Sequence, residues 1–218
     1  MPSTPKKSPR RTDMKPKALV LFALLTSVLM LPAFTLHGQQ AAPLPPEPVT
    51  LTVPDIDVVN QFGEHVKFNS GVVKGRIAVI AGFFTNCTSM CPITQENMAK
   101  LAKLLGDRMG REVEFVSLST DATNDTPPRM KAWAEKYKVG EGWTLASGNK
   151  SDVTTLLKSL GLYVDIPQRH QSALIIGNQE SGWVRASSWL PPEKLLKIID
   201  AAAAADKPAA EKQASAAK

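Results

Sequence analysis

Apolar runs of strand length alternate with segments of helical spacing along most of this chain, and this alternation constrains its fold more than any other feature. Residues 76–84 (RIAVIAGFF) form an unbroken apolar run that predicts a buried strand, and residues 91–109 follow with helical spacing. Residues 113–120 predict a second buried strand, and residues 126–139 predict a helix opened by Thr126 with prolines in its first turn. Strands and helices in this order predict a sheet covered by helices.

The C-terminal part continues the alternation and adds a hairpin. Residues 151–162 predict a helix with Ser151 as its N-cap, residues 172–188 predict a β-hairpin, and residues 191–202 predict a closing helix. The chain is therefore expected to be of the α/β class, with a mixed central sheet flanked by helices, and a thioredoxin-like fold fits this order. In the helix at residues 91–109, the apolar side chains at helical spacing are Ile93, Met98, Leu101, Leu104 and Leu105.

An apolar segment near the N-terminus indicates export or membrane anchoring. Residues 18–36 contain no ionisable side chain and follow a stretch rich in Lys and Arg, which is the pattern of a signal peptide or an anchor. Basic residues stay in the cytoplasm, so the rest of the chain is expected on the periplasmic side of a bacterial inner membrane. Residues 1–37 are predicted to be a cytoplasmic tail followed by this segment. Cleavage and retention both stay open, because no clean A-x-A site follows and Pro32 interrupts the run.

Two low-complexity segments frame one predicted domain at residues 51–202. Residues 38–50 hold four prolines and no helical or strand period, and are predicted to be an extended linker. Residues 203–218 are rich in Ala and Lys and are expected to be a frayed or disordered tail, because they cannot bury an apolar face.

The positive net charge of the chain does not indicate nucleic-acid binding. Of 26 Lys and Arg residues and 20 acids, six basic residues and one acid lie within residues 1–39, which leaves the rest close to neutral. No basic patch interleaved with aromatic residues occurs in the sequence, so the electrostatic signature of a nucleic-acid partner is missing.

Both cysteines lie in one C-x-x-x-C-P motif, Cys87 and Cys91, between the predicted strand at residues 76–84 and the helix at residues 91–109. Two cysteines cannot build the disulfide framework of a small secreted domain, and a local disulfide across so short a loop stabilises little. At a helix N-terminus, backbone N–H groups stabilise a thiolate, the form that both attacks disulfides and binds metal. The pair is therefore interpreted as a redox couple or as two arms of a metal site.

A third donor would decide between these two chemistries, and the chain has three histidines. Thioredoxin-type enzymes use C-x-x-C, and the additional residue here alters the redox poise without preventing oxidation. Two thiolates alone can hold Cu(I), while an added imidazole makes a site more selective. His37 borders the apolar segment, and His65 is expected to be solvated or structural. His170, in the loop leading into the predicted hairpin, is expected to face the cysteines and is the predicted third donor.

Four segments of the chain occur together in a characteristic order. They are FFTNCTSMCP, VSLSTDATNDTPPRMKAWAEKY, GWTLASGNKSDVTTLLKSLGL and RHQSALIIG, within residues 53–200. In this order they resemble the Sco/SenC family, the copper-binding assembly factors of cytochrome c oxidase. The resemblance implies that Cys87, Cys91 and His170 are the ligands of one copper ion, Cu(I) or Cu(II). It also implies that Asp121 is a supporting residue near the site and not a ligand.

The sequence departs from the family pattern beside these residues. Thr88 stands where the family's C-P-x-x-C-P motif has proline, and Arg169 stands where an acidic residue usually precedes the histidine. A guanidinium next to the imidazole opposes a cationic metal and would favour Cu(I) over Cu(II). Asp125 opens a D-T-P run that predicts a helix start, with Asp125 or Thr126 as its cap.

The resemblance implies a metallochaperone that delivers copper to the Cu-A site of cytochrome c oxidase during assembly. Its partners would be the oxidase subunit carrying that site, together with other copper chaperones or thiol reductants. The alternative is a thiol-disulfide reductase in which Cys87 and Cys91 form the redox pair and reduce the oxidase's copper-ligand cysteines. A peroxidase of the peroxiredoxin kind is disfavoured, because the Pro-x-x-x-Thr-x-x-Cys context does not occur in the sequence.

Overall fold

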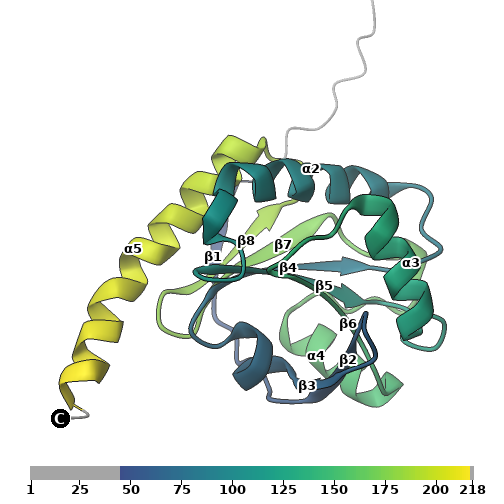
Figure 1. Cartoon of the computed structure of the whole chain (residues 1–218), viewed down its shortest axis with the longest axis horizontal. Coiled ribbons are helices and arrows are strands. Elements are labelled where there is room, and N and C mark those ends of the chain that lie inside the picture. The colour runs from purple at the N-terminus through teal and green to yellow at the C-terminus, as the bar shows by residue number, and fades with distance from the viewer. Residues whose placement is uncertain (1–44, 217–218) are drawn as a thin grey trace, which may run out of the picture. The chain divides into compact units, whose positions relative to one another are not determined.

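The computed structural model describes residues 45–216, with side chains described as far as residue 206. An eight-stranded mixed sheet has the strand order β1-β8-β7-β4-β5-β6-β2-β3 (Figure 1). The strands are β1 Glu47–Val49, β2 Asp57–Asn60, β3 His65–Lys67, β4 Ile77–Phe83, β5 Val113–Ser119, β6 Trp143–Ser147, β7 Ala173–Asn178 and β8 Gly182–Ser187. The helices are α2 Met90–Leu105, α3 Pro127–Tyr137, α4 Lys150–Ser159 and α5 Pro192–Ala216, with short helical segments η1 Phe68–Val73, η2 Gly106–Arg108 and η3 Pro167–Arg169. The predicted α/β class, a mixed sheet flanked by helices, is confirmed.

The central strands β4 and β5 are buried along their whole length, as their apolar runs predict. They run parallel to each other, and β4 pairs antiparallel with β7 on its other side. Successive side chains of a strand point to opposite faces of a sheet. Val79 and Phe83 therefore enter one core, and Ala78 and Ile80 enter the other.

Helices cover both faces of this sheet (Figure 1). Helices α2, α3 and α5 share one core with the sheet, and α4 and η1 share the other. The buried apolar side chains of the first group include Met98, Leu101 and Leu105 from α2, Met130 and Trp133 from α3, and Leu195 and Ile199 from α5. Because both faces are covered, the ends of the strands are where chemistry can reach solvent.

The apolar spacing of α2 predicts part of its inward face. Met98, Leu101 and Leu105 are buried as expected, but Ile93 and Leu104 are 53% and 48% exposed. The buried stripe begins at Cys91 and returns at Thr94 and Met98, which lie about one helical turn apart. A pattern of apolar residues could not locate the first turns of this stripe, because they are occupied by a cysteine and a threonine.

Helix boundaries also shift from the expected ones. Helix α2 ends at Leu105, short of residue 109, because Gly106 has a φ of 53°, a positive value that glycine adopts without strain. Asn149, and not Ser151, caps α4: its side chain accepts a hydrogen bond from the Ser151 N–H at 2.9 Å.

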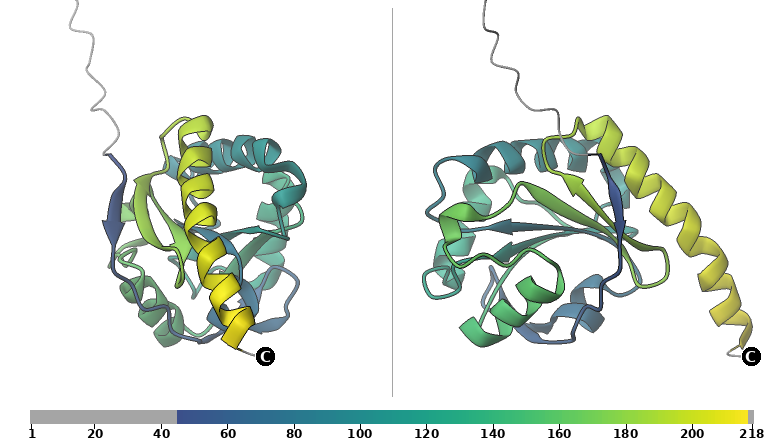
Figure 2. Two further views of the ribbon diagram at one scale, coloured as in Figure 1. Left: turned by 90° about the vertical axis from the view of Figure 1, so that its left-hand side faces the viewer. Right: turned by 180° about the vertical axis from the view of Figure 1, so that it is seen from behind.

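The prediction of an extended linker at residues 38–50 is wrong for its last residues. Glu47–Val49 form β1, an edge strand that pairs antiparallel with β8 (Figure 2). Pro48 is tolerated there because an edge strand leaves one row of backbone groups unpaired. The strands β2, β3 and β6 are not predicted either, because each is too short to show a clear period.

Helix α5 is longer than the closing helix expected at residues 191–202. It continues to Ala216 and extends past the sheet (Figure 2). The prediction of a frayed tail at residues 203–218 is therefore wrong as far as residue 216. Alanine and lysine have high helix propensity, which sustains a helix even where the sequence offers no apolar stripe.

Among residues 45–216, no helix is both long and apolar enough to cross a membrane. The segment at residues 18–36, for which a signal peptide or anchor is predicted, lies outside the described residues, as do the rest of residues 1–37 and His37 itself.

Candidate functional site

Three loops meet at one end of the central strands because of how β4 pairs with its neighbours. Strands β4 and β5 are parallel, with Phe83 opposite Ser119, so the loops that leave both strands lie at the same end of the sheet. Strand β7 is antiparallel to β4, with Ala81 opposite Leu174, so the loop that enters β7 lies at this end too. The cysteines follow β4 and His170 precedes β7. The topology thereby joins residues up to 83 positions apart.

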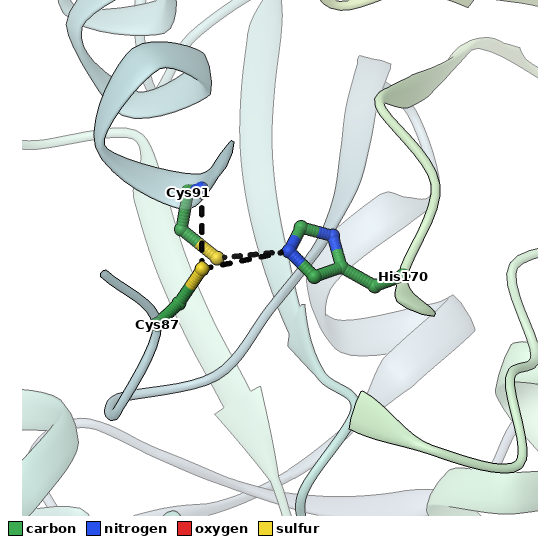
Figure 3. Close-up of side chains that lie close together, drawn as sticks. All are labelled: Cys87, Cys91 and His170. Atoms are coloured by element: carbon green, nitrogen blue, oxygen red, sulfur yellow. Dashed lines mark hydrogen bonds between the residues drawn. The ribbon is translucent and has the colours of Figure 1, made fainter. Parts of the chain in front are cut away.

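Cys87 lies in the loop after β4, and Cys91 lies in the first turn of α2. The residue before the helix, Ser89, provides no side-chain cap. Instead, the Cys91 N–H donates a hydrogen bond to the Cys87 sulfur at 3.3 Å (Figure 3). This sulfur therefore serves as an acceptor for the free N–H groups at the start of the helix, which favours its thiolate form. Both cysteines are free.

His170 points at both sulfurs from the opposite side (Figure 3). Its Nε2 lies 3.1 Å from Cys91 Sγ and 3.7 Å from Cys87 Sγ. The ring of Phe84 packs edge-on against the imidazole, with 5.7 Å between ring centroids. The three donor atoms lie within 4.8 Å of one another, and the described part of the chain contains no second group of this kind. The structure thus brings together the three residues that the sequence analysis singles out.

The two thiols differ in pKa. Burial alone would raise the pKa of Cys87, but hydrogen bonds from the Cys91 thiol and from the backbone of Cys91 and Ser89 outweigh it and lower this pKa. Cys91 is 1% exposed against 6% for Cys87, and this burial raises the pKa of Cys91, with the hydrogen bond to Cys87 adding to the effect. Burial also lowers the pKa of His170. The site therefore offers one thiol that loses its proton more readily than an ordinary cysteine, a second thiol whose proton is held more tightly, and an imidazole whose neutral form is favoured by burial.

This donor set suits some metals and not others. Two sulfurs and one imidazole are soft or intermediate donors, which fit copper or zinc and fit magnesium or calcium poorly. The group contains no carboxylate. The same pair of thiols can also close a disulfide, because their two sulfurs lie within 4.8 Å of each other. On donor chemistry alone, soft-metal binding and thiol exchange are both open to this site.

Asp125 does not have the place that the sequence analysis gives it. Thr126 is the N-cap residue of α3 and makes no side-chain capping bond. Asp125 is buried, and its carboxylate accepts hydrogen bonds from Thr85 and Ser119, so it does not cap the helix either. Thr85 could not be found from the sequence, because its partner lies 40 positions away and no motif surrounds it.

Three other residues considered in the sequence analysis lie outside the thiol-imidazole group. The Asp121 carboxylate accepts hydrogen bonds from the Asn124 side chain at 2.9 and 3.0 Å. Arg169 is directed to solvent, where it lies 3.8 Å from Asp165 with both side chains more than two-thirds exposed. An ion pair so exposed contributes little to the stability of the fold. His65 is exposed on β3 and is not a member of the group.

A thioredoxin-like fold that presents two thiols at a helix start and an imidazole opposite them defines a protein built for thiol or soft-metal chemistry. Within that class, residues 46–186 match SCO1/SenC, and the chain belongs to the SCO1/SenC family.

Individual relatives agree with this assignment. A SCO1 protein homolog of Bacillus subtilis is 28% identical over 165 residues, which is 72% of this chain and 82% of the relative. A candidate copper-binding protein of Stutzerimonas stutzeri is 28% identical over 110 residues, so the match spans only 52% of that relative's length and 50% of this chain. The crystal structure of a SCO1/SenC family lipoprotein from Bacillus anthracis superposes with a TM-score of 0.63 at 28% identity, covering 72% of this chain and 98% of that one.

Proposed function

We propose that the chain binds one copper ion through Cys87, Cys91 and His170. The observation that carries the proposal is the convergence of two sulfurs and one imidazole nitrogen within 4.8 Å of one another. Copper is favoured over zinc because the chain belongs to the SCO1/SenC family and one relative is named as a candidate copper-binding protein. Thiolates hold Cu(I), and the imidazole adds a ligand that Cu(II) accepts well.

The copper is cargo in this proposal. The chain delivers it to the Cu-A site of cytochrome c oxidase during assembly, and its partner is the oxidase subunit that carries that site. Membership of a family of oxidase assembly factors supports this role. Within the site, Cys87 is slightly less buried than Cys91, with 6% of the residue exposed against 1%. We expect an incoming ligand of the acceptor to approach from the Cys87 side.

The second candidate is thiol-disulfide exchange, and the unequal pKa values of the two thiols favour it. The Cys87 thiolate attacks one sulfur of a partner disulfide, and the other partner sulfur leaves as a thiolate. Cys91 then loses its proton and attacks the Cys87 sulfur, which releases the second partner sulfur. The partner gains two thiols, and Cys87 and Cys91 end as a disulfide that a thiol reductant must reopen.

A His170→Ala variant separates these two functions. The reduced protein is titrated with Cu(I) and with Cu(II), and the variant is expressed in cells that lack the parent chain. Under copper delivery, the variant loses Cu(II) binding, keeps weaker Cu(I) binding through the two thiols, and assembles oxidase only with excess copper. Under thiol exchange, oxidase assembly stays nearly intact, because attack on a disulfide needs only the cysteines.

The matched control is His65→Ala, since His65 is exposed on β3 outside the group. It should bind both copper ions as the parent does. If His170→Ala binds Cu(II) as tightly as the parent and assembles oxidase, His170 is not a ligand and copper delivery is rejected.

We also propose the setting in which this site works. Residues 1–37 carry a cytoplasmic tail and the segment that exports or anchors the chain, and residues 38–46 form a linker that separates the domain from the membrane. The domain then faces the periplasm, where the Cu-A subunit is reached. The SCO1/SenC relative from Bacillus anthracis is described as a lipoprotein, which supports this setting.

A further inference from the structure

A buried carboxylate lies next to the cysteine loop without touching either sulfur. Asp125 is 2% exposed and lies in the segment between β5 and α3. Its Oδ1 accepts two hydrogen bonds from Thr85, one from the backbone N–H at 2.9 Å and one from the hydroxyl at 2.6 Å. Its Oδ2 accepts a hydrogen bond from the Ser119 hydroxyl at 2.6 Å. One side chain therefore joins the cysteine loop to the end of β5.

Thr85 lies close enough to Cys87 in the chain for its hydrogen bonds to Asp125 to restrain the position of the thiol. It stands two positions before Cys87, in the short segment between the last residue of β4 and the first turn of α2. Within this segment, the Cys87 N–H donates to the Phe84 carbonyl at 3.1 Å, so Cys87 is tied to the residue that precedes Thr85. Fixing Thr85 consequently limits where the Cys87 sulfur can lie relative to His170.

Other contacts hold this loop less firmly. Arg129 donates to the side chain of Asn86, but that bond is exposed to water. The Thr120 hydroxyl donates to the Phe83 carbonyl at 3.1 Å, which secures the end of β4 and not the loop beyond it. The bonds to Asp125 are shielded from water, unlike the Arg129 bond, and a carboxylate is a stronger acceptor than a backbone carbonyl such as that of Phe83. Burial also raises the pKa of Asp125, with the hydrogen bonds from Ser119 and Thr85 opposing that rise.

We propose that Asp125 is a positioning residue, which holds the Thr85–Cys87 segment against the end of β5 and so keeps the Cys87 sulfur at the start of α2, facing His170. The inference rests on the proposed function in one respect: the thiol-imidazole group must be the working site. It serves copper binding and disulfide closure alike, because both need the two sulfurs close together before they react.

The test compares three variants of the full chain. Thr85→Val removes only the hydroxyl bond to Asp125, and Asp125→Asn weakens all three bonds while keeping the side-chain volume. Thr120→Val is the matched control, because it removes a threonine hydroxyl at the same strand end that touches neither Asp125 nor Thr85. Cu(I) affinity is measured by competition with a coloured chelator, and the dithiol-disulfide equilibrium is measured against glutathione without metal. Urea unfolding reports stability separately.

Thr85→Val and Asp125→Asn should each lower Cu(I) affinity about tenfold, the lower end of the range for groups that orient metal ligands. Both should also make the Cys87–Cys91 disulfide harder to form, because the sulfurs meet less often. Thr120→Val should change neither quantity. The Cu(I) affinity of the double variant should be little lower than that of Asp125→Asn alone, since both changes act on the same contact between Thr85 and Asp125. If Asp125→Asn fails to fold, Thr85→Val and its control decide the question.

Two results overturn the proposal. Thr85→Val and Asp125→Asn could lower the free energy of unfolding while leaving Cu(I) affinity and disulfide formation at the parent's values, which makes Asp125 merely structural. Thr120→Val could instead reproduce their effects, which makes the strand end and not the carboxylate responsible. Failure of the proposed copper binding can be told apart from failure of this inference. In the first case the parent protein itself binds no Cu(I), and the equilibrium with glutathione still tests whether Asp125 positions Cys87.

Discussion

The two sulfurs of the site are chemically unequal although they stand four positions apart in the chain. The Cys87 sulfur accepts a hydrogen bond from the Cys91 N–H at the start of α2. Cys91 is the more buried residue, and its thiol donates a hydrogen bond to the Cys87 sulfur. An asymmetry of this kind is useful in either proposed function. It makes Cys87 the thiol that deprotonates and reacts at the lower pH, and Cys91 the thiol that reacts at the higher pH.

Alkylation should reveal this asymmetry. In the reduced, metal-free protein, Cys87 should react with iodoacetamide at a pH below the ordinary thiol pKa of about 8.5, because its thiolate is stabilised. Cys91 should react only at higher pH. Peptide mass spectrometry over a pH series measures both residues in one sample. Equal reactivity of the two, rising only above pH of about 8.5, would contradict the helix-start stabilisation.

His170 should make stability depend on pH. Burial lowers its pKa in the folded protein from the ordinary value of 6.5, so the unfolded chain takes up a proton first as the pH falls. The stability present above pH 6.5 is therefore lost progressively below it. Urea unfolding of the metal-free, reduced chain at pH 7.5 and 5.5, experimental settings of about one pH unit either side, should show a smaller difference for His170→Gln than for the parent. An identical difference in both proteins would show that another group is responsible.

Sequence reasoning reaches the three donors but not the residue that positions them. Cys87 and Cys91 are visible because they share one motif, and His170 is visible because the expected fold directs its loop toward them. The bond between Thr85 and Asp125 is invisible, because it joins loops that are 40 positions apart. The D-T-P run that contains Asp125 predicts a helix start equally well, and only burial distinguishes the two roles.

At the scale of elements, α2 depends on a polar anchor as well as on its apolar stripe. The Asn97 side chain donates to the carbonyls of Ser188 and Leu190 at 2.7 and 2.8 Å, which ties α2 to the segment between β8 and α5. The Thr94 and Ser188 hydroxyls lie 3.0 Å apart in the same region. The helix that carries Cys91 is thus fixed at its middle as well as at its start.

Asn97→Ala should lower the free energy of unfolding by about 1–3 kcal/mol, because it leaves two carbonyls without their donor. Urea unfolding measures the change. The control is Glu96→Ala, an exposed neighbour on the same helix, which should change stability by no more than about 0.5 kcal/mol. Similar losses in both variants would mean that helix propensity and not the anchor sets the cost.

Elements are predictable in proportion to their length and burial. The central strands β4 and β5 are found because each is an unbroken apolar run between two covered faces. The short strands β1, β2, β3 and β6 are missed because they lie toward the edges, where pairing partners and not side-chain period decide the structure. The full extent of α5 is missed for the opposite reason: alanine-rich sequence forms helix without any apolar pattern.

At the scale of the whole molecule, export of the domain across a membrane is a prediction from the sequence. The basic stretch before residues 18–36 should hold the N-terminus in the cytoplasm. A reporter fused after Lys218 that is active only outside the cytoplasm should therefore be active, and one that is active only inside should be silent. Replacing the six Lys and Arg residues of the first 39 with Gln should weaken this bias. Strong activity of the cytoplasmic reporter in the unaltered chain would overturn the assigned orientation.

The pairing of β4 with β7 has a consequence for the order in which the site comes into being. A chain emerges from synthesis or export N-terminus first. A partial chain that ends after β6 already carries Cys87 and Cys91, but it lacks the strand that brings His170 beside them. Such a chain has two thiols and no imidazole, so it is open to premature oxidation and to indiscriminate soft metals. The complete donor set exists only after the last hairpin has docked, so in the proposed function copper binding through all three residues would require a completely folded domain.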